Sequence, residues 1–191
     1  MKLIVAGIDP ALSNFGLAKA TYDVETGVLT PYALQLIQTD NQTGKQVRKN
    51  SDDLRRASES CFAVHEWLSD CALVIVEIPT GSQSARGAVS YGVSLGILSS
   101  IGVGDFKGRM IQVQPTEVKM AAVGSKHAGK DEMIEWAVDK YPDLPWLKGR
   151  GGPGKKNEHL SDALGAIHAG MKTDEFKNLT AAISSLGKIK S

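Results

Sequence analysis

The sequence predicts an α/β domain built on a five-stranded mixed sheet with helices on both faces. Short apolar runs alternate with segments of helical periodicity, which is the pattern of an α/β protein. The first three strand candidates follow one another through short connections, which favours an antiparallel meander. Five consecutive apolar residues at 72–76 are typical of a strand buried on both faces.

The predicted elements follow one another as three strands, a helix, a strand, a helix, a strand and three helices. The strands are predicted at residues 3–8, 15–22, 28–37, 72–77 and 110–113. The helices are predicted at residues 53–70, 85–101, 115–122, 130–140 and 158–171. Because crossovers between parallel strands are right-handed, strand 72–77 should lie parallel to and beside strand 3–8, with helix 53–70 on one face.

Three segments fall outside this pattern. Residues 39–52 are polar and predict a surface loop. Seven of the fifteen residues at 142–156 are Gly or Pro, which also indicates a loop. We therefore expect one domain over residues 1–171, followed by a polar tail over residues 172–191.

The charge balance excludes some classes of protein. Lys and Arg total 22 against 21 for Asp and Glu, and this net charge of +1 excludes a histone-like polycation and an acidic tail protein. Nucleic acid stays open as a partner, because a local basic patch can exist within a neutral total. No apolar run reaches the roughly 18–20 residues of a membrane span. Cys61 and Cys71 lack metal-binding spacing, so we expect buried, reduced thiols in a cytoplasmic protein.

Two carboxylates end the two most apolar strand candidates. Asp9 directly follows strand 3–8, and Glu77 closes strand 72–77. If these strands are parallel neighbours, both acids project at the same carboxyl edge of the sheet, where open α/β sheets bind ligands. Their repulsion would raise one pKa unless a cation lies between them.

The last predicted helix carries two more candidate ligands. His159 and Asp162 are three residues apart and therefore share a helix face. If Asn157 caps this helix, His159 lies in its first turn, where the helix dipole favours a neutral imidazole. Three carboxylates and one imidazole suit Mg²⁺ or Mn²⁺ better than structural zinc. Singly, each residue fits a turn, an exposed strand end or a solvated helix position; together they indicate a metal-dependent active site.

Four segments, in order along the chain, resemble RuvC-type Holliday junction resolvases. Residues 7–16 (GIDPALSNFG) resemble the opening Gly-Ile-Asp-Pro-Gly segment of that family. Residues 76–77 (VE) resemble its second acidic strand end, and residues 115–130 resemble its basic stretch, with two lysines eleven residues apart. Residues 158–164 (EHLSDAL) resemble the closing segment, where Asp-Ala-Leu follows an acidic or His residue three positions before the Asp.

The resemblance implies an RNase H-like fold and a homodimer that cuts four-way DNA junctions symmetrically. It implies Asp9, Glu77, His159 and Asp162 as the catalytic, metal-binding set. For two Mg²⁺ ions (or Mn²⁺), we expect Asp9 to bridge both, Glu77 to hold one and Asp162 the other, with His159 on the second ion or on the attacking water. Ala11 replaces a family Gly, and no aromatic residue directly follows Glu77. These departures suggest a phage-type or otherwise divergent member, acting in a bacterial or phage-infected cell.

The surface that faces DNA is expected to be basic, because every phosphate contact involves charge. The resemblance implies that Lys119 and Lys130 contact the scissile phosphate region or the DNA backbone. A second basic run, free of acids, precedes the last helix. The expected DNA-binding residues are Lys119, Lys126, Lys130, Lys148, Arg150, Lys155 and Lys156. A further basic stretch at residues 45–56 is offset by two aspartates and is typical of a solvated face.

Three other functions fit parts of the sequence. An actin-like or sugar-kinase ATPase opens similarly but needs a second, related domain, for which this chain is too short. A non-catalytic junction-binding protein should lack one or more of the four site residues, all of which are present. A nuclease of the same fold that cuts RNA–DNA hybrids or other branched DNA stays open, because the sequence does not show a dimer. Gly92 and Gly96 fit either close helix packing or a dimer seam.

Overall fold

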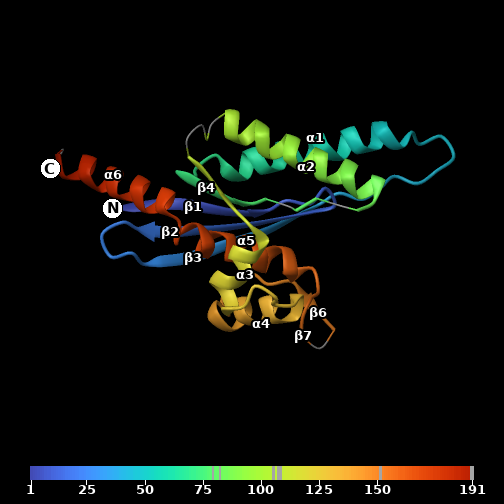
Figure 1. Cartoon of the computed structure of the whole chain (residues 1–191). Coiled ribbons are helices and arrows are strands. Elements are labelled where there is room, and N and C mark those ends of the chain that lie inside the picture. Colours follow the sequence, from blue (N-terminus) through green and yellow to red (C-terminus); the bar gives the residue numbers. More distant parts are fainter. Residues whose placement is uncertain (79, 82, 105, 107–108, 151, 190–191) are drawn as a thin grey trace.

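The computed structural model describes residues 1–78, 80–81, 83–104, 106, 109–150 and 152–189, with residues 186–189 by their backbone alone. Pro79, after the second acid, and Gly151, in the Gly- and Pro-rich segment, lie outside this description. A five-stranded mixed sheet in the order β3-β2-β1-β4-β5 forms the middle of the molecule, with helices on both faces (Figure 1). The predicted fold class is confirmed.

The sheet joins an antiparallel meander to a parallel part. Its strands are β1 (Lys2–Asp9), β2 (Asn14–Asp23), β3 (Leu29–Gln38), β4 (Leu73–Glu77) and β5 (Met110–Val113). β1 pairs antiparallel with β2 and parallel with β4, and β4 pairs parallel with β5. The central residues of β1 and β4 are buried on both faces, which explains their unbroken apolar runs.

Helices α1 (Lys49–Leu68) and α2 (Ala85–Val103) cover one face of the sheet (Figure 1). Val64 of α1 and Ile97 of α2 pack with side chains of β1 and β4 in one core cluster. The apolar spacing of helix 53–70 predicts Leu54 on its buried side, but Leu54 is 69% exposed. That prediction is wrong because the helix begins at Lys49 and turns polar residues inward along its first half.

A buried ionic network occupies the inward side of this first half of α1. The Arg56 guanidinium is 2% exposed and donates hydrogen bonds to Ser13 Oγ at 2.6 Å and to Thr39 Oγ1 at 3.2 Å. Asp53 accepts two hydrogen bonds from the guanidinium of Arg86, near the start of α2. The network fastens the β1–β2 turn, the loop after β3 and α2 to α1. The interpretation of this basic stretch as a solvated face is therefore wrong for Arg56.

Helix α5 (Asn157–Gly170) covers the opposite face, and α3 (Pro115–Val123) and α4 (Lys130–Lys140) pack against it (Figure 1). Asn157 is the first residue of α5 rather than the cap that the sequence predicts. Its side chain instead accepts a hydrogen bond from the Leu147 N–H and donates one to the Leu147 carbonyl. This clamp attaches the Gly- and Pro-rich segment to the start of α5.

The C-terminal part holds three elements that the sequence did not predict. A short hairpin pairs β6 (Lys148–Gly149) with β7 (Gly152–Pro153). The expected polar tail contains helix α6 (Asp174–Ile189), in which Phe176 is 1% exposed and meets the Tyr22 ring edge-on at 5.0 Å between centroids. No helix in the described ranges combines the length and apolar character needed to cross a membrane.

Both cysteines are free thiols, as expected. Cys71 is buried, and burial raises its pKa to about 12, so it has little thiolate character. Cys61 is only partly buried, packed against the edge of the core under α1 and α2.

Candidate active site

Asp9 and Glu77 lie at the same edge of the sheet, at the carboxyl ends of β1 and β4. The register pairs Ile8 with Val76, so the two acids occupy the next positions on neighbouring parallel strands. Neighbouring strands lie about 4.8 Å apart. This edge is also where open α/β sheets bind ligands.

Helix α5 approaches the sheet closely at two glycines. A Cβ at Gly7 would lie 1.9 Å from the carbonyl oxygen of Ala163, and a Cβ at Gly16 would lie 2.0 Å from that of His159. Neither distance is possible for a real side chain, so only glycine permits this packing. The first two turns of α5 therefore lie directly on β1 and β2, and His159 reaches Asp9.

His159 forms a short hydrogen bond with the first acid, at 2.6 Å between His159 Nδ1 and Asp9 Oδ2. Burial opposes a charge on the imidazole, but this hydrogen bond and the charges of Asp9, Glu158 and Asp162 outweigh it and raise the pKa of His159. The helix dipole alone would lower the pKa of His159, and the surrounding carboxylates act against it.

Glu77 and Asp162 have strongly raised pKa values. Burial, followed by the negative charges of Asp9 and Asp162, raises the pKa of Glu77 to about 9. Burial and the charge of Asp9 raise the pKa of Asp162 to about 7. The ammonium of Lys119 lowers both values, though less strongly. The three carboxyl groups and Lys119 are therefore within electrostatic reach of one another.

Glu77→Gln is expected to stabilise the protein at pH 8 in a buffer with a metal chelator. The folded state raises the pKa of Glu77 from 4.5 to about 9, so it keeps a proton that the unfolded chain releases above pH 4.5. Wild-type stability therefore falls as the pH rises across this window, and the neutral amide removes that loss. At pH 8 the variant should melt ~2–4 °C higher, the equivalent of about 1 kcal/mol for a chain of this size. Thermal unfolding at pH 5 and pH 8 measures the effect; an identical pH slope for both proteins would contradict the charge cluster.

The donor set suits a divalent cation. The carboxylates of Asp9, Glu77 and Asp162 are hard oxygen ligands, and the imidazole of His159 is compatible with Mn²⁺ or Mg²⁺ sites. Crowded carboxyl groups with raised pKa values are those that a cation stabilises in the ionised form. Among the described residues, no three His, Cys, Asp or Glu side chains already form a metal-coordinating group.

Two of the expected DNA-binding lysines lie at this edge of the sheet. Lys119 of α3 is partly buried and acts electrostatically on Glu77 and Asp162. Lys130, the first residue of α4, forms an ion pair of 2.7 Å with Glu158. Glu158 is a residue of the site that the sequence analysis did not single out; its place directly before His159 was the available signal.

The other expected DNA-binding residues lie on exposed connections. Lys126 follows α3, and the β6–β7 hairpin carries Lys148 and Arg150. Lys155 and Lys156 directly precede α5. None of these five exposed side chains forms an ion pair with an acidic residue in the described part of the chain, which leaves their charges accessible to other molecules.

Comparison with solved structures identifies proteins of the same fold. RuvC of T. thermophilus, in a complex with a Holliday junction substrate, aligns over 87% of this chain and 92% of its own, with a TM-score of 0.59 and 22% sequence identity. The yeast mitochondrial Holliday junction resolvase Ydc2 aligns over 94% of this chain and 83% of its own, with a TM-score of 0.60 and 13% identity. No protein-family model and no curated protein sequence matches the chain. The likeness therefore shows a shared fold.

Proposed function

We propose that this chain, which has the fold of the RuvC-type resolvases, is a divalent-metal-dependent endonuclease that resolves four-way DNA junctions in recombination and repair. It would cut by paired, symmetric phosphodiester hydrolysis. The observation that carries this proposal is the convergence of Asp9, Glu77, His159 and Asp162 at the ligand-binding edge of the sheet. The T. thermophilus protein of the same fold was solved with a junction bound, which supports the choice of substrate.

Each of the four side chains has a proposed part in the reaction. When bound, two Mg²⁺ or Mn²⁺ ions would supply an activated water and neutralise charge on the phosphate. Asp9 would bridge both ions, Glu77 would hold one and Asp162 the other, all three in the ionised form. His159 would hold the second ion or orient the attacking water. The water oxygen would bond to phosphorus and release a proton to solvent, while the bond to one ester oxygen would break and that oxygen would take up a proton from solvent.

The basic residues would hold the DNA around this centre. Lys119 and Lys130 are nearest to the acidic cluster and would contact the phosphate that is cut. The exposed residues of the connections would extend this track along the backbone, as phosphate contacts supply most of the non-specific affinity of DNA-binding proteins. This second group is Lys126, Lys148, Arg150, Lys155 and Lys156.

A cleavage assay with matched substrates tests the proposal. Purified protein is incubated with a four-way junction, a fork, a linear duplex and an RNA–DNA hybrid, with Mg²⁺ or with a chelator. We expect cleavage of the junction in preference to the other three substrates, and only with the metal. Equal cleavage of the fork or the hybrid would favour a broader nuclease of the same fold. Junction binding without cleavage in either Mg²⁺ or Mn²⁺ would favour a non-catalytic junction-binding protein.

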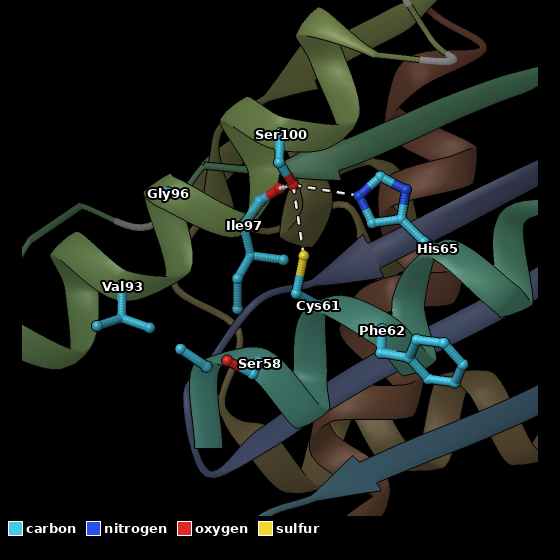
Figure 2. A pocket seen from close by; sticks show the side chains of 9 residues that line it. Ser58, Cys61, Phe62, His65, Val93, Gly96, Ile97 and Ser100 are labelled. Atoms are coloured by element: carbon cyan, nitrogen blue, oxygen red, sulfur yellow. Dashed lines mark hydrogen bonds between the residues drawn. The ribbon is translucent and has the colours of Figure 1, made fainter. Parts of the chain in front are cut away.

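A homodimer would supply the second active site that a symmetric cut requires, and we propose the outer side of α1 and α2 as its interface. An apolar groove of about 650 Å³ lies between these helices, and Figure 2 shows Cys61 and Phe62 of α1 and Val93 and Ile97 of α2 along it. None of its nine lining residues is Lys, Arg, Asp or Glu. Phe62 is 73% exposed beside this hollow. A protruding ring and a groove on one surface are what a two-fold interface between identical copies needs.

The spacing of residues on α2 also supports a contact between helices. Apolar and small residues recur there at intervals of four and three, the 3.5-residue period with which a helix faces a partner helix. A Cβ at Gly92 or Gly96 would meet no atom of the described residues within 4 Å beyond the backbone of its own helix, so neither glycine serves close packing there. Gly96 lines the groove and would be part of the dimer seam. The residues of the repeat are Val89, Val93, Gly96, Ser100 and Val103.

Phe62→Glu is expected to weaken the dimer at least ~30-fold, because losing a central aromatic side chain of an interface costs ~2 kcal/mol or more. Sedimentation velocity over a range of micromolar concentrations measures the change. Val28→Glu is the matched control, since Val28 is 55% exposed and lies in the turn before β3, away from α1 and α2. A monomeric wild type, or an unchanged dimer in Phe62→Glu, would contradict this interface.

A further inference from the structure

One acidic side chain outside the proposed metal-binding set connects two parts of the candidate site. The two carboxylate oxygens of Glu158, in the first turn of α5, have different partners. Oε2 lies 2.7 Å from Lys130 Nζ, and Oε1 lies 3.5 Å from His159 Nε2. The other nitrogen of His159, Nδ1, lies 2.6 Å from Asp9 Oδ2. Lys130, Glu158, His159 and Asp9 therefore form one continuous chain of polar contacts.

Folding stability alone does not account for the contact between Glu158 and Lys130. The Lys130 side chain is 78% exposed, against 21% for Glu158. Ion pairs with so exposed a partner contribute little to stability, because water screens them and both side chains lose rotamer freedom. The contact does, however, restrict a long and flexible ammonium group to one direction.

The negative charge of Glu158 is unfavourable for the binding of DNA. Its negative charge lies beside two groups that are expected to face a polyanion, and it neutralises one of the lysines that would contact phosphate. A carboxylate that served only the helix N-terminus could have pointed to solvent. Here it points to Lys130 on another helix and to the imidazole that contacts Asp9.

We infer that Glu158 is a positioning residue, which holds the Lys130 ammonium and the His159 ring in place beside Asp9 for the phosphate that is cut. This inference rests on the proposed nuclease function. It predicts different effects on the rate of cleavage and on the affinity for DNA. Removal of Glu158 should slow cleavage of bound DNA, since Lys130 and His159 lose their orientation. It should not weaken DNA binding, since a negative charge is removed.

Single-turnover kinetics with saturating protein tests this separation. Glu158→Ala should cleave a four-way junction at least ~10-fold more slowly than wild type, with unchanged or tighter junction binding. Asp174→Ala is the matched control, because Asp174 is also an acid in the first turn of a helix and pairs with a lysine, Lys177, at 3.1 Å. The control should match wild type in both measurements. Equal cleavage by Glu158→Ala and wild type would overturn the inference.

A double variant and a metal titration identify the route by which Glu158 acts. If it acts partly through Lys130, the loss of rate in Lys130→Ala with Glu158→Ala should be smaller than the product of the two single losses. A loss of rate in the double variant equal to that product would show that Glu158 does not act through Lys130. The Mg²⁺ concentration for half-maximal cleavage should be the same in Glu158→Ala and wild type. A tenfold increase would make Glu158 a metal ligand and would also overturn a positioning role.

A measurement without DNA or metal tests the contact itself. Lysine amines labelled by reductive ¹³C-methylation give separate NMR resonances, and the one assigned to Lys130 should shift and sharpen in Glu158→Ala but not in Asp174→Ala. An unchanged resonance would overturn the inference even if junctions are cleaved. If wild type cleaves no junction but the resonance shifts, the proposed function fails while the contact holds.

Discussion

Asp9→Asn is expected to lower the rate of junction cleavage by about 10³-fold or more, the equivalent of ~4 kcal/mol in activation free energy. Asp9 acts on the other three residues of the set: it hydrogen-bonds His159, and its charge raises the pKa of Glu77 and of Asp162. Asparagine lacks the negative charge and the second oxygen with which Asp9 would bridge the two cations. Single-turnover cleavage in Mg²⁺ measures the rate.

The fold and the junction affinity should survive this substitution. Asparagine has the shape of aspartate and keeps an oxygen that can accept the hydrogen bond from His159 Nδ1–H. Asp143→Asn is the matched control, because it makes the same change at an exposed position in the connection after α4. The control should cleave at the wild-type rate. Wild-type cleavage by Asp9→Asn would contradict the assignment of the active site.

Gly16→Ala is expected to destabilise the protein by about 1–3 kcal/mol or more, because a single methyl group would force α5 away from the sheet. Its Cβ would lie 2.0 Å from the carbonyl oxygen of His159 and 3.0 Å from the His159 Cβ. The same displacement moves the imidazole away from Asp9, so the folded fraction should also cleave junctions more slowly. Urea unfolding measures the stability, and cleavage corrected for the folded fraction measures the effect on the site.

Gly92→Ala provides the matched glycine control. Gly92 lies within α2, and a Cβ there would meet no atom of the described residues within 4 Å beyond the backbone of its own helix. Alanine favours a helix interior over glycine by up to ~1 kcal/mol, so this variant should unfold at the same or a higher urea concentration. If Gly16→Ala were as stable as Gly92→Ala, α5 could not lie on β2 as closely as described.

Elements that depend on local periodicity could be predicted closely from the sequence. β5 and α4 begin and end at the predicted residues, and the parallel pairing of β1 with β4 follows from the right-handed crossover. That pairing is enough to put Asp9 beside Glu77, since both acids end their strands. The sequence alone therefore predicts that Asp9 and Glu77 lie next to each other.

Contacts between distant segments could not be predicted in this way. Arg56 donates to Ser13 across 43 positions of the chain, and its spacing on α1 looks like that of any solvated helix charge. The pair between Lys130 and Glu158 joins the starts of two helices, whose relative placement no local pattern determines. The raised pKa of His159 depends partly on its hydrogen bond to Asp9, which is 150 positions away along the chain.

Helix α6 is a different case, because its signal was present in the sequence. Phe176, Leu179 and Ile183 recur at helical spacing. The polar composition of residues 172–191 concealed this stripe. The contact of Phe176 with Tyr22 and the packing of Leu179 against the core show which side of the helix is buried and where it docks.

A paired cut by two copies of the chain is the central claim, and a supercoiled plasmid that extrudes a cruciform measures it most directly. Two nicks made within one protein–DNA complex convert the plasmid directly to linear DNA, whereas independent nicks first relax it to a nicked circle. We predict linear DNA as the first product of the wild type in Mg²⁺, and nicked circles as the first product of Phe62→Glu. Nicked circles as the first product of the wild type would contradict paired resolution by a dimer.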